Sequence, residues 1–269
     1  MDVVRSVSDL RQAILFHRRA GRSVGFVPTT GIIHDGQLSL AREARERDGC
    51  VVVSRMLDDA RPDEARDLTL LERERVDLVF VPDADLLTPD RQATRIRVEG
   101  LTDRLEGASR PGYFDALATA TLKLLHLVGP KHLYLGQKDA QAVAVLRRMV
   151  ADLCLNLEIV VCPTVREPDG LALSSANAAL SIEERHAATC LPAALNAAAE
   201  AHRRGERSAE VLRARMGEVI AAEDRARIDY VSVADPDSLL ELQRLRGPAI
   251  ALLAAWIGRI RLTDNLPLA

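Results

Sequence analysis

Between residues 23 and 162, short runs of Val, Ile and Leu alternate with longer segments whose apolar residues follow a helical period. The apolar runs occupy residues 23–27, 50–54, 76–81, 132–135 and 157–162, and helical spacing covers 37–47, 66–75, 115–127 and 139–153. Strands that are apolar throughout and alternate with helices are typical of a parallel sheet covered on both faces. Ligands of such sheets bind beyond the carboxyl ends of the strands. The pattern therefore predicts an α/β fold with a ligand site at that edge.

The pattern changes after about residue 165. Ser181 and Glu184 form a capping box, which predicts the start of a long Ala-rich helix that runs to about residue 204. A second helix is expected over 209–222, and residues 229–233, 249–254 and 259–262 have the pattern of strands in a small separate sheet. We therefore place a domain boundary near Thr164, with a larger domain at 1–164 and a smaller α+β domain at 165–269.

The composition argues against several classes of function. The net charge of −3 is unlike that of a non-specific nucleic-acid binder, which usually carries a basic face. No segment approaches the roughly 20 apolar residues that span a bilayer, and the first residues lack the layout of a signal peptide. We therefore expect a cytoplasmic protein without nucleic-acid or membrane partners. The four cysteines are widely spaced, so we expect buried, reduced side chains rather than disulfides or a zinc site.

The segment that follows the first apolar run, residues 28–37, is the strongest indication of a ligand site. It leaves a strand, turns at Gly31 and enters a helix close to His34 and Gly36. The N-terminus of a helix offers unpaired N–H groups and a partial positive charge, which suit a phosphate. An imidazole in that first turn can stabilise charge that develops on a polyphosphate. The alternative is an ordinary turn with an incidental histidine, because short motifs often match by chance.

Residues 136–139 form a second candidate, at the end of the fourth apolar run. Gly136 permits close backbone approach, Lys138 can reach a phosphate, and Asp139 can cap the next helix. An exposed loop lysine is the simpler reading of Lys138. The chain has only three lysines, however, which strengthens the functional interpretation.

Two further segments complete the set. Residues 169–177 place the hydroxyls of Ser174 and Ser175 near a glycine, an arrangement that suits phosphate oxygens, although a helix-capping serine is the simpler interpretation. Residues 105–114 form a long segment rich in Gly and Pro, and long ordered loops are often functional.

In their order and spacing, these four segments resemble the pantothenate synthetase family, and the resemblance runs from Phe26 to Asn265. That family, which serves pantothenate biosynthesis, joins pantoate to β-alanine through a pantoyl-adenylate and releases pyrophosphate and then AMP. The resemblance implies a Rossmann-like parallel sheet of the nucleotidylyltransferase type and a small C-terminal lid domain that closes over ATP. It also implies the use of Mg²⁺, and usually a homodimer.

By position, the resemblance assigns His34, Lys138 and Gln37 to catalysis and leaves the metal ligands unknown. The ATP site that it implies comprises Pro28, Thr29, Thr30, Gly31, His34, Gly36, Gly136, Lys138, Asp139, Val165, Ser174 and Ser175. The acid-substrate pocket that it implies comprises Thr30, Gln37, Asp58, Arg61, Gln141 and Ala142.

The chain departs from the family mainly at this pocket. Gln37 stands where the family has a second histidine, and Ala176 stands where an arginine follows the two serines. Losing one such transition-state contact typically costs several kcal/mol. A segment that contains Tyr-Pro-Arg is missing. Other family residues are replaced as well. Thr30 replaces a methionine, Asp58 and Arg61 stand nearest an Asn and a Gln, Ala142 replaces a second glutamine, and Tyr113 replaces a histidine. Arg66 and Leu70 stand where the family has an acidic and an amide residue near Mg²⁺.

These departures cluster at the ligand pocket, whereas the strands and turns keep their pattern, which favours altered substrate use over decay of the gene. Arg61 could pair with a second carboxylate on a different acid. Three functions remain open. The first is an AMP-forming ligase that activates pantoate or another acid and transfers it to an amine such as β-alanine. The others are a non-catalytic nucleotide-binding paralogue and a nucleotidyltransferase that acts on a phosphorylated substrate.

Overall fold

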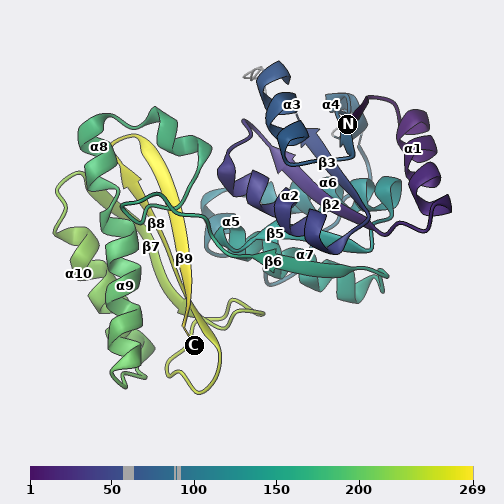
Figure 1. The fold of residues 1–269 in the computed structure, drawn as a ribbon. Helices are drawn as coiled ribbons and strands as arrows, with labels where there is room; N and C mark the ends of the chain where they lie inside the picture. Colours follow the sequence, from purple (N-terminus) through teal and green to yellow (C-terminus); the bar gives the residue numbers. More distant parts are fainter. Residues whose placement is uncertain (57–63, 88, 90–91, 269) are drawn as a thin grey trace. The chain divides into compact units, whose positions relative to one another are not determined.

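The computed structural model describes residues 1–56, 64–87, 89 and 92–268. Two residues of the predicted acid pocket, Asp58 and Arg61, lie outside these ranges. The chain divides into two compact units, Met1–Pro163 and Thr164–Ala269 (Figure 1). Each unit is described by itself.

The first unit is built on a six-stranded sheet in the order β1-β4-β3-β2-β5-β6, and every described strand pair is parallel. Its strands are β1 (Asp2–Val4), β2 (Val24–Thr30), β3 (Cys50–Met56), β4 (Leu78–Phe80), β5 (His132–Gly136) and β6 (Glu158–Cys162). Its helices are α1 (Val7–Arg19), α2 (Asp35–Arg47), α3 (Glu64–Arg73), α4 (Ala84–Leu87), α5 (Glu106–Ser109), α6 (Tyr113–Val128), the 3-10 turn η1 (Gln137–Asp139) and α7 (Ala140–Asp152). The predicted α/β class is confirmed.

Strand β2 is the point where the strand order reverses. It pairs with β3 on one side and with β5 on the other. From β2 the chain continues outward through β3 and β4, and later returns to the opposite side to form β5 and β6 (Figure 1). Open α/β sheets bind ligands at such a switch point, beyond the carboxyl ends of the strands.

The apolar strands are buried because helices cover the sheet. On one face, Val51 and Val53 of β3 pack with Leu38 and Ala41 of α2 and Leu71 of α3. Burial of each Val or Leu side chain is worth about 1.5–3 kcal/mol relative to exposure. The continuous Val, Ile and Leu runs of the sequence therefore have a direct structural cause.

A buried polar cluster ties together the amino ends of three strands. Asp48, which precedes β3, lies 2.9 Å from Nδ1 of His132 and accepts a 2.7 Å hydrogen bond from the Tyr134 hydroxyl, both on β5. Its carboxylate passes Gly25 of the intervening strand β2, where an added Cβ would lie 2.5 Å from an Asp48 oxygen. Only glycine leaves room for this contact. Burial, followed by the bond to Asp48, raises the pKa of Tyr134 well above its usual value.

Three features of the first unit differ from expectation. The segment 105–114, expected as a long loop, contains α5 and the first residues of α6. Strand β1 and helix α1 were not predicted; β1 is only three residues long, and α1 buries only Leu10, Ile14 and His17. Strand β2 does not stop at Pro28 but continues to Thr30. Proline lacks an N–H and is tolerated where one edge of a strand is unpaired. Because β5 pairs with β2 only at Gly25 and Phe26, Pro28 lies beyond that pairing.

The second unit contains an antiparallel sheet of β7 (Ala226–Ala234), β8 (Ala249–Ile257) and β9 (Ile260–Leu268). Its helical elements are η2 (Ser175–Ala179), α8 (Ile182–Ala187), α9 (Cys190–Arg203) and α10 (Ala209–Ala221). Leu191 and Leu195 of α9 pack with Leu212 and Met216 of α10 and with Leu253 of β8. The smaller α+β unit of the prediction is confirmed.

The predicted long helix after Ser181 is wrong in one respect. The capping box is present, since Ser181 Oγ accepts from Glu184 N at 3.2 Å and Glu184 Oε2 accepts from Ser181 N at 2.9 Å. The helix nevertheless breaks between α8 and α9. Pro192 is the physical reason, because its ring clashes with the carbonyl four residues earlier and it lacks the N–H that an uninterrupted helix would use.

The cysteines differ in exposure, contrary to the expectation that all are buried. Cys50 and Cys162 are buried and Cys190 is half-buried, whereas Cys154 is exposed. Burial raises the pKa of Cys50 to about 12 and that of Cys162 to about 11. Within the described residues, no helix has the length and apolar character needed to cross a bilayer.

Candidate active site

The strand-to-helix corner predicted from residues 28–37 lies at the carboxyl end of β2. The strand ends at the exposed Thr30, and Gly31 follows with a φ of 69°, a conformation that favours glycine. The hydroxyl of Thr29 donates to the carbonyl of Ser54 at 2.9 Å and is therefore used within the sheet. Helix α2 then begins, with His34 as its N-cap residue.

His34 is held in one tautomer by its capping role. Its Nδ1 accepts a hydrogen bond from the Gly36 N–H at 3.1 Å, so the proton of the neutral ring is on Nε2. Burial, followed by the positive charge of Lys138, lowers the pKa of His34 below its usual 6.5, against the opposing charges of Asp139 and Asp35. At neutral pH His34 is therefore an uncharged donor, and the N–H of Gly36 is already occupied.

Gln37 braces the same corner. Its Oε1 accepts from the His34 N–H at 3.1 Å, and its Nε2 donates to the Thr30 carbonyl at 3.0 Å. The two ends of the amide thus bond to the backbone on both sides of the turn, which completes a capping box. The sequence indicated a catalytic or substrate-binding role for Gln37, and the structure gives its amide this bracing role within the loop.

Lys138 and Asp139 follow the adjacent strand β5. Strand β5 pairs with β2, the strand that leads to His34, and the two charges act on the pKa of His34 in opposite directions, Lys138 lowering it and Asp139 raising it. Asp139 is the N-cap residue of α7, but its side chain makes no capping bond, so the predicted capping role is wrong. A Cβ added to Gly136 would meet no protein atom within 4 Å, so the fold itself does not require glycine there. That open space fits the predicted close approach of a ligand.

Tyr113, noted in the sequence only as a substitution, belongs to this neighbourhood. Burial and then the charge of Asp139 raise its pKa, and the guanidinium carbon of Arg110 lies 3.7 Å from the centroid of its ring. The charge of Asp139 therefore acts on both His34 and Tyr113.

Gln141 has a position different from the one expected for a substrate ligand. It is only 4% exposed, and its Nε2 donates to the carbonyls of Leu101 and Arg104, both at 2.8 Å. Its Oε1 accepts from the Glu106 N–H at 3.0 Å. These bonds flank Leu105, which has a φ of 47° without being glycine. Gln141 thus anchors a strained turn before α5, and the neighbouring Ala142 is half-buried.

A buried ion pair, which the sequence analysis missed, lies next to the His34 corner. Arg55 at the end of β3 and Asp67 in α3 are both 0% exposed, and Arg55 Nε is 2.9 Å from Asp67 Oδ2. Asp67 Oδ1 also accepts from the backbone N–H of Ile33, the residue before His34, at 3.4 Å. A signal was present in the sequence, because an arginine that ends an apolar strand needs a buried partner.

In the second unit, polar contacts fix the segment that carries the two predicted serines. Arg166 forms a double ion pair with Asp264 of β9 at 2.6 and 3.0 Å. The carbonyl of Val165 accepts from the Leu173 N–H at 2.9 Å. Ser174 Oγ accepts from the Ala176 N–H at 3.3 Å, so Ser174 is a capping serine, and Ser175 is exposed.

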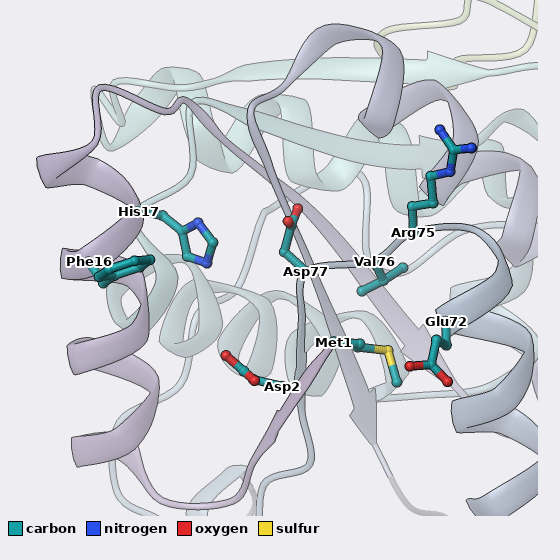
Figure 2. A pocket seen from close by; sticks show the side chains of 8 residues that line it. All are labelled: Met1, Asp2, Phe16, His17, Glu72, Arg75, Val76 and Asp77. Carbon is teal, nitrogen blue, oxygen red and sulfur yellow. The ribbon is translucent and has the colours of Figure 1, made fainter.

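A surface pocket of about 380 Å³ lies elsewhere on the first unit. Figure 2 shows Phe16 and His17 of α1 on one side of it and Glu72 of α3 on the other, with Met1 between them. Asp2 begins β1 and Asp77 precedes β4, so this pocket is at the amino ends of the strands. It is therefore separate from the corner that carries His34.

The described part of the chain offers no group of three or more His, Cys, Asp or Glu side chains that could hold a metal ion. At the two positions where the family resemblance implies residues near Mg²⁺, Arg66 is exposed and Leu70 is half-buried. Neither side chain is a ligand that Mg²⁺ prefers.

Comparison with known proteins gives a consistent result. A family model described as pantoate-beta-alanine ligase matches residues 2–267. The pantothenate synthetase of Roseiflexus sp. is 47% identical over 276 residues, which cover 98% of each chain. That of Acidobacterium capsulatum is 47% identical over 256 residues, covering 91% of this chain and 86% of the relative.

Solved structures agree with this assignment. The pantothenate synthetase of Thermus thermophilus has a TM-score of 0.92 and 40% identity, with 99% of each chain covered. The pantoate-beta-alanine ligase of Francisella tularensis, solved with a β-γ ATP ligand and β-alanine, has a TM-score of 0.76 and 29% identity, covering 99% of this chain and 97% of that one. From its sequence, fold and corner geometry, the chain belongs to the pantoate–β-alanine ligase family.

Proposed function

We propose that the protein is an ATP-dependent, AMP-forming ligase that condenses pantoate with β-alanine. In the first step the pantoate carboxylate attacks the α-phosphorus of ATP, which forms pantoyl-adenylate and releases pyrophosphate. In the second step the amine of β-alanine attacks the acyl carbon, AMP leaves, and the amine loses a proton. The observation that carries the proposal is the full-length family match combined with an uncharged His34 Nε2–H donor beside Lys138.

The corner supplies chemistry suited to the first step. Negative charge builds on the phosphates as the bond to pyrophosphate breaks, and preorganised donors and cations stabilise such charge. In this proposal His34 donates through Nε2–H and Lys138 contributes a fixed positive charge. Gln37 contributes by holding the corner in shape, through its two backbone bonds.

The remaining assignments belong to the same proposal. The nucleotide contacts the loop formed by Pro28, Thr29, Thr30, Gly31 and Gly36, together with Gly136 and Asp139. A role in ATP binding for Val165, Ser174 and Ser175 stays a prediction that the family resemblance implies. Thr30, Ala142 and the positions Asp58 and Arg61 define the acid pocket, and Gln141 supports it through the turn at Leu105. Mg²⁺ enters with ATP, because it typically binds substrate phosphates and water. The active form is a homodimer, which light scattering over a range of protein concentrations tests.

The test of function is product formation by the purified protein with Mg-ATP, pantoate and β-alanine. We expect equimolar AMP and pantothenate, and, with hydroxylamine in place of β-alanine, a pantoyl hydroxamate that reports the adenylate. Ala142 replaces an amide that the family uses, so the same assay with other hydroxy acids and dicarboxylates defines the acid specificity. ATP binding without turnover of any acid would instead identify a non-catalytic paralogue. Transfer of the nucleotide onto a stable product would identify a nucleotidyltransferase.

Two lysines, one beyond each end of β5, provide a matched pair of variants. Lys138 follows the carboxyl end of the strand, and the exposed Lys131 precedes its amino end. Lys138→Met should lower the rate of pyrophosphate release by about 10²–10³-fold, the usual effect of losing one charge-stabilising contact. Lys131→Met should leave it unchanged. Equal rates in the two variants would contradict the role of Lys138.

A further inference from the structure

The backbone of Ile33 is clamped from behind the His34 corner by two side chains of α3. Asp67 Oδ1 accepts from the Ile33 N–H at 3.4 Å, and Arg66 Nη1 donates to the Ile33 carbonyl at 3.1 Å. The same Arg66 nitrogen lies 3.1 Å from Asp67 Oδ1. Because the Ile33 side chain is fully buried, both the side chain and the backbone of the residue before His34 are fixed.

The carboxylate of Asp67 is paired with Arg55 as well as with Arg66. The side chains of Arg55 and Asp67 are almost completely buried, at 1% and 0% exposure, with 2.9 Å between Arg55 Nε and Asp67 Oδ2. A buried carboxylate is costly unless it is paired and hydrogen-bonded. Arg55 is held on β3 in register with Thr29 of β2, the strand that leads into the corner. The pair therefore links α3 and β3 to the loop that ends at His34.

Packing alone does not explain this pair. Buried ion pairs can often be replaced by apolar residues without loss of stability. An apolar pair, however, could not accept a hydrogen bond from Ile33. The specific contribution of Asp67 is thus an acceptor at one place in the backbone, immediately before the N-cap of α2.

We propose that Asp67 is a positioning residue of the ligase: charge-balanced by Arg55, it holds the Ile33 peptide and thereby sets the position of the His34 ring. The inference rests on the proposed function for its catalytic readout. A displacement of about 1 Å in a catalytic group can cost about 10²-fold in rate. Loss of the acceptor should therefore lower the rate of adenylate formation strongly while changing the stability of the fold only slightly.

Two double variants separate the acceptor from the charge. Arg55→Met with Asp67→Leu removes both charges and the acceptor, whereas Arg55→Met with Asp67→Asn removes both charges but keeps an oxygen that can accept from Ile33. At saturating ATP and pantoate, we expect pyrophosphate release to fall about 10- to 100-fold in the first variant. We expect it to stay within about threefold of the parent in the second, because the hydrogen bond is retained.

The control is a second Arg–Asp pair, part-buried rather than fully buried, that also accepts from a backbone N–H and lies at the opposite end of the sheet. Asp77 lies 2.5 Å from Arg45 Nη1 and accepts from the Val51 N–H at 2.8 Å. Arg45→Met with Asp77→Leu should lower the thermal midpoint without changing the rate beyond about twofold, because the altered site is remote from His34. A loss of rate as large as that in the Asp67→Leu variant would mean that general destabilisation, and not positioning, lowers the rate.

Amide hydrogen exchange over residues 31–38 provides a readout that does not depend on turnover. Exchange there should be faster in the double variant with Asp67→Leu. It should be close to that of the parent in the double variant with Asp67→Asn. If the Asp67→Leu variant does not fold, Arg66→Leu, which alters a half-exposed side chain, should give faster exchange and a several-fold lower rate. The inference is overturned if the double variants with Asp67→Leu and Asp67→Asn have the same exchange rates and the same rates of pyrophosphate release. If Arg66→Leu is used in their place, it is overturned when neither exchange nor pyrophosphate release changes. If the parent itself forms no adenylate, the proposed function fails, and the exchange data alone decide whether Asp67 holds the corner.

Discussion

Replacing Gln141 by leucine should loosen the turn at Leu105 more than it affects any other part of the first unit. The change removes three hydrogen bonds, to the carbonyls of Leu101 and Arg104 and from the Glu106 N–H, of which the bond to Leu101 is buried and the other two are part-buried. Taking about 1–3 kcal/mol for the buried group and about 0.5–1.5 kcal/mol for each of the others, the loss is about 2–6 kcal/mol. Leu105 adds to the effect, because a non-glycine residue at its φ of 47° persists only when its surroundings hold it.

The measurement is urea unfolding followed by circular dichroism, together with hydrogen exchange over residues 101–110. The single tryptophan, Trp256, is in the second unit, so its fluorescence would not follow this change. The control is Gln12→Leu on the exposed face of α1, expected to change the unfolding free energy by no more than about 0.5 kcal/mol. Gln141→Glu keeps the acceptor for Glu106 but loses both donors at neutral pH, so it should be at least as destabilising as leucine. A loss below about 1 kcal/mol for Gln141→Leu, with unchanged exchange, would refute the anchoring role.

Two further predictions concern the His34 corner. The pKa of His34, followed by NMR of its ring protons, should lie below 6.5; Lys138→Gln should raise it and Asp139→Asn should lower it further, because the two charges act in opposite directions. Since the folded pKa is the lower one, the stability that depends on neutral His34 is fully present above pH 6.5 and is lost as the pH falls from there through the folded pKa. A shift of the same sign in Lys138→Gln and Asp139→Asn would contradict the electrostatic reasoning. Gln37→Ala removes both backbone bonds and should lower the unfolding free energy by about 1–2 kcal/mol, whereas Gln37→Glu retains the acceptor for the His34 N–H and should lie between Ala and the parent. Identical urea midpoints for all three proteins would show that the brace contributes nothing to stability.

Much of the fold was predictable because its main features are local. The alternation of apolar runs and helical segments predicted the parallel sheet, and the capping box at Ser181 predicted the start of α8. The corner at Gly31 and His34 was also predictable, since a strand, a glycine turn and a helix start follow each other directly. The break before α9 was missed because Pro192 is not at the break itself. It is the third residue of α9, and a proline disrupts the helical turn that precedes it.

The parts of the site that escaped prediction depend on contacts between distant segments. Whether the Gln141 amide faces a ligand or the turn near Arg104, 37 residues away, is decided by tertiary packing. The same holds for Arg55, whose partner Asp67 lies on the next helix. Position in a motif indicated which residues gather at the sheet edge, but it did not indicate which of them support their neighbours.

The polar cluster of Asp48, His132 and Tyr134 has a consequence for how this protein can diversify. It fastens three central strands at the end opposite the His34 corner, and it depends on a glycine near the amino end of β2. Substitutions at the His34 corner therefore leave these contacts intact. As long as Gly25, Asp48, His132 and Tyr134 are kept, residues at the His34 corner can change without loss of the contacts that join these three strands.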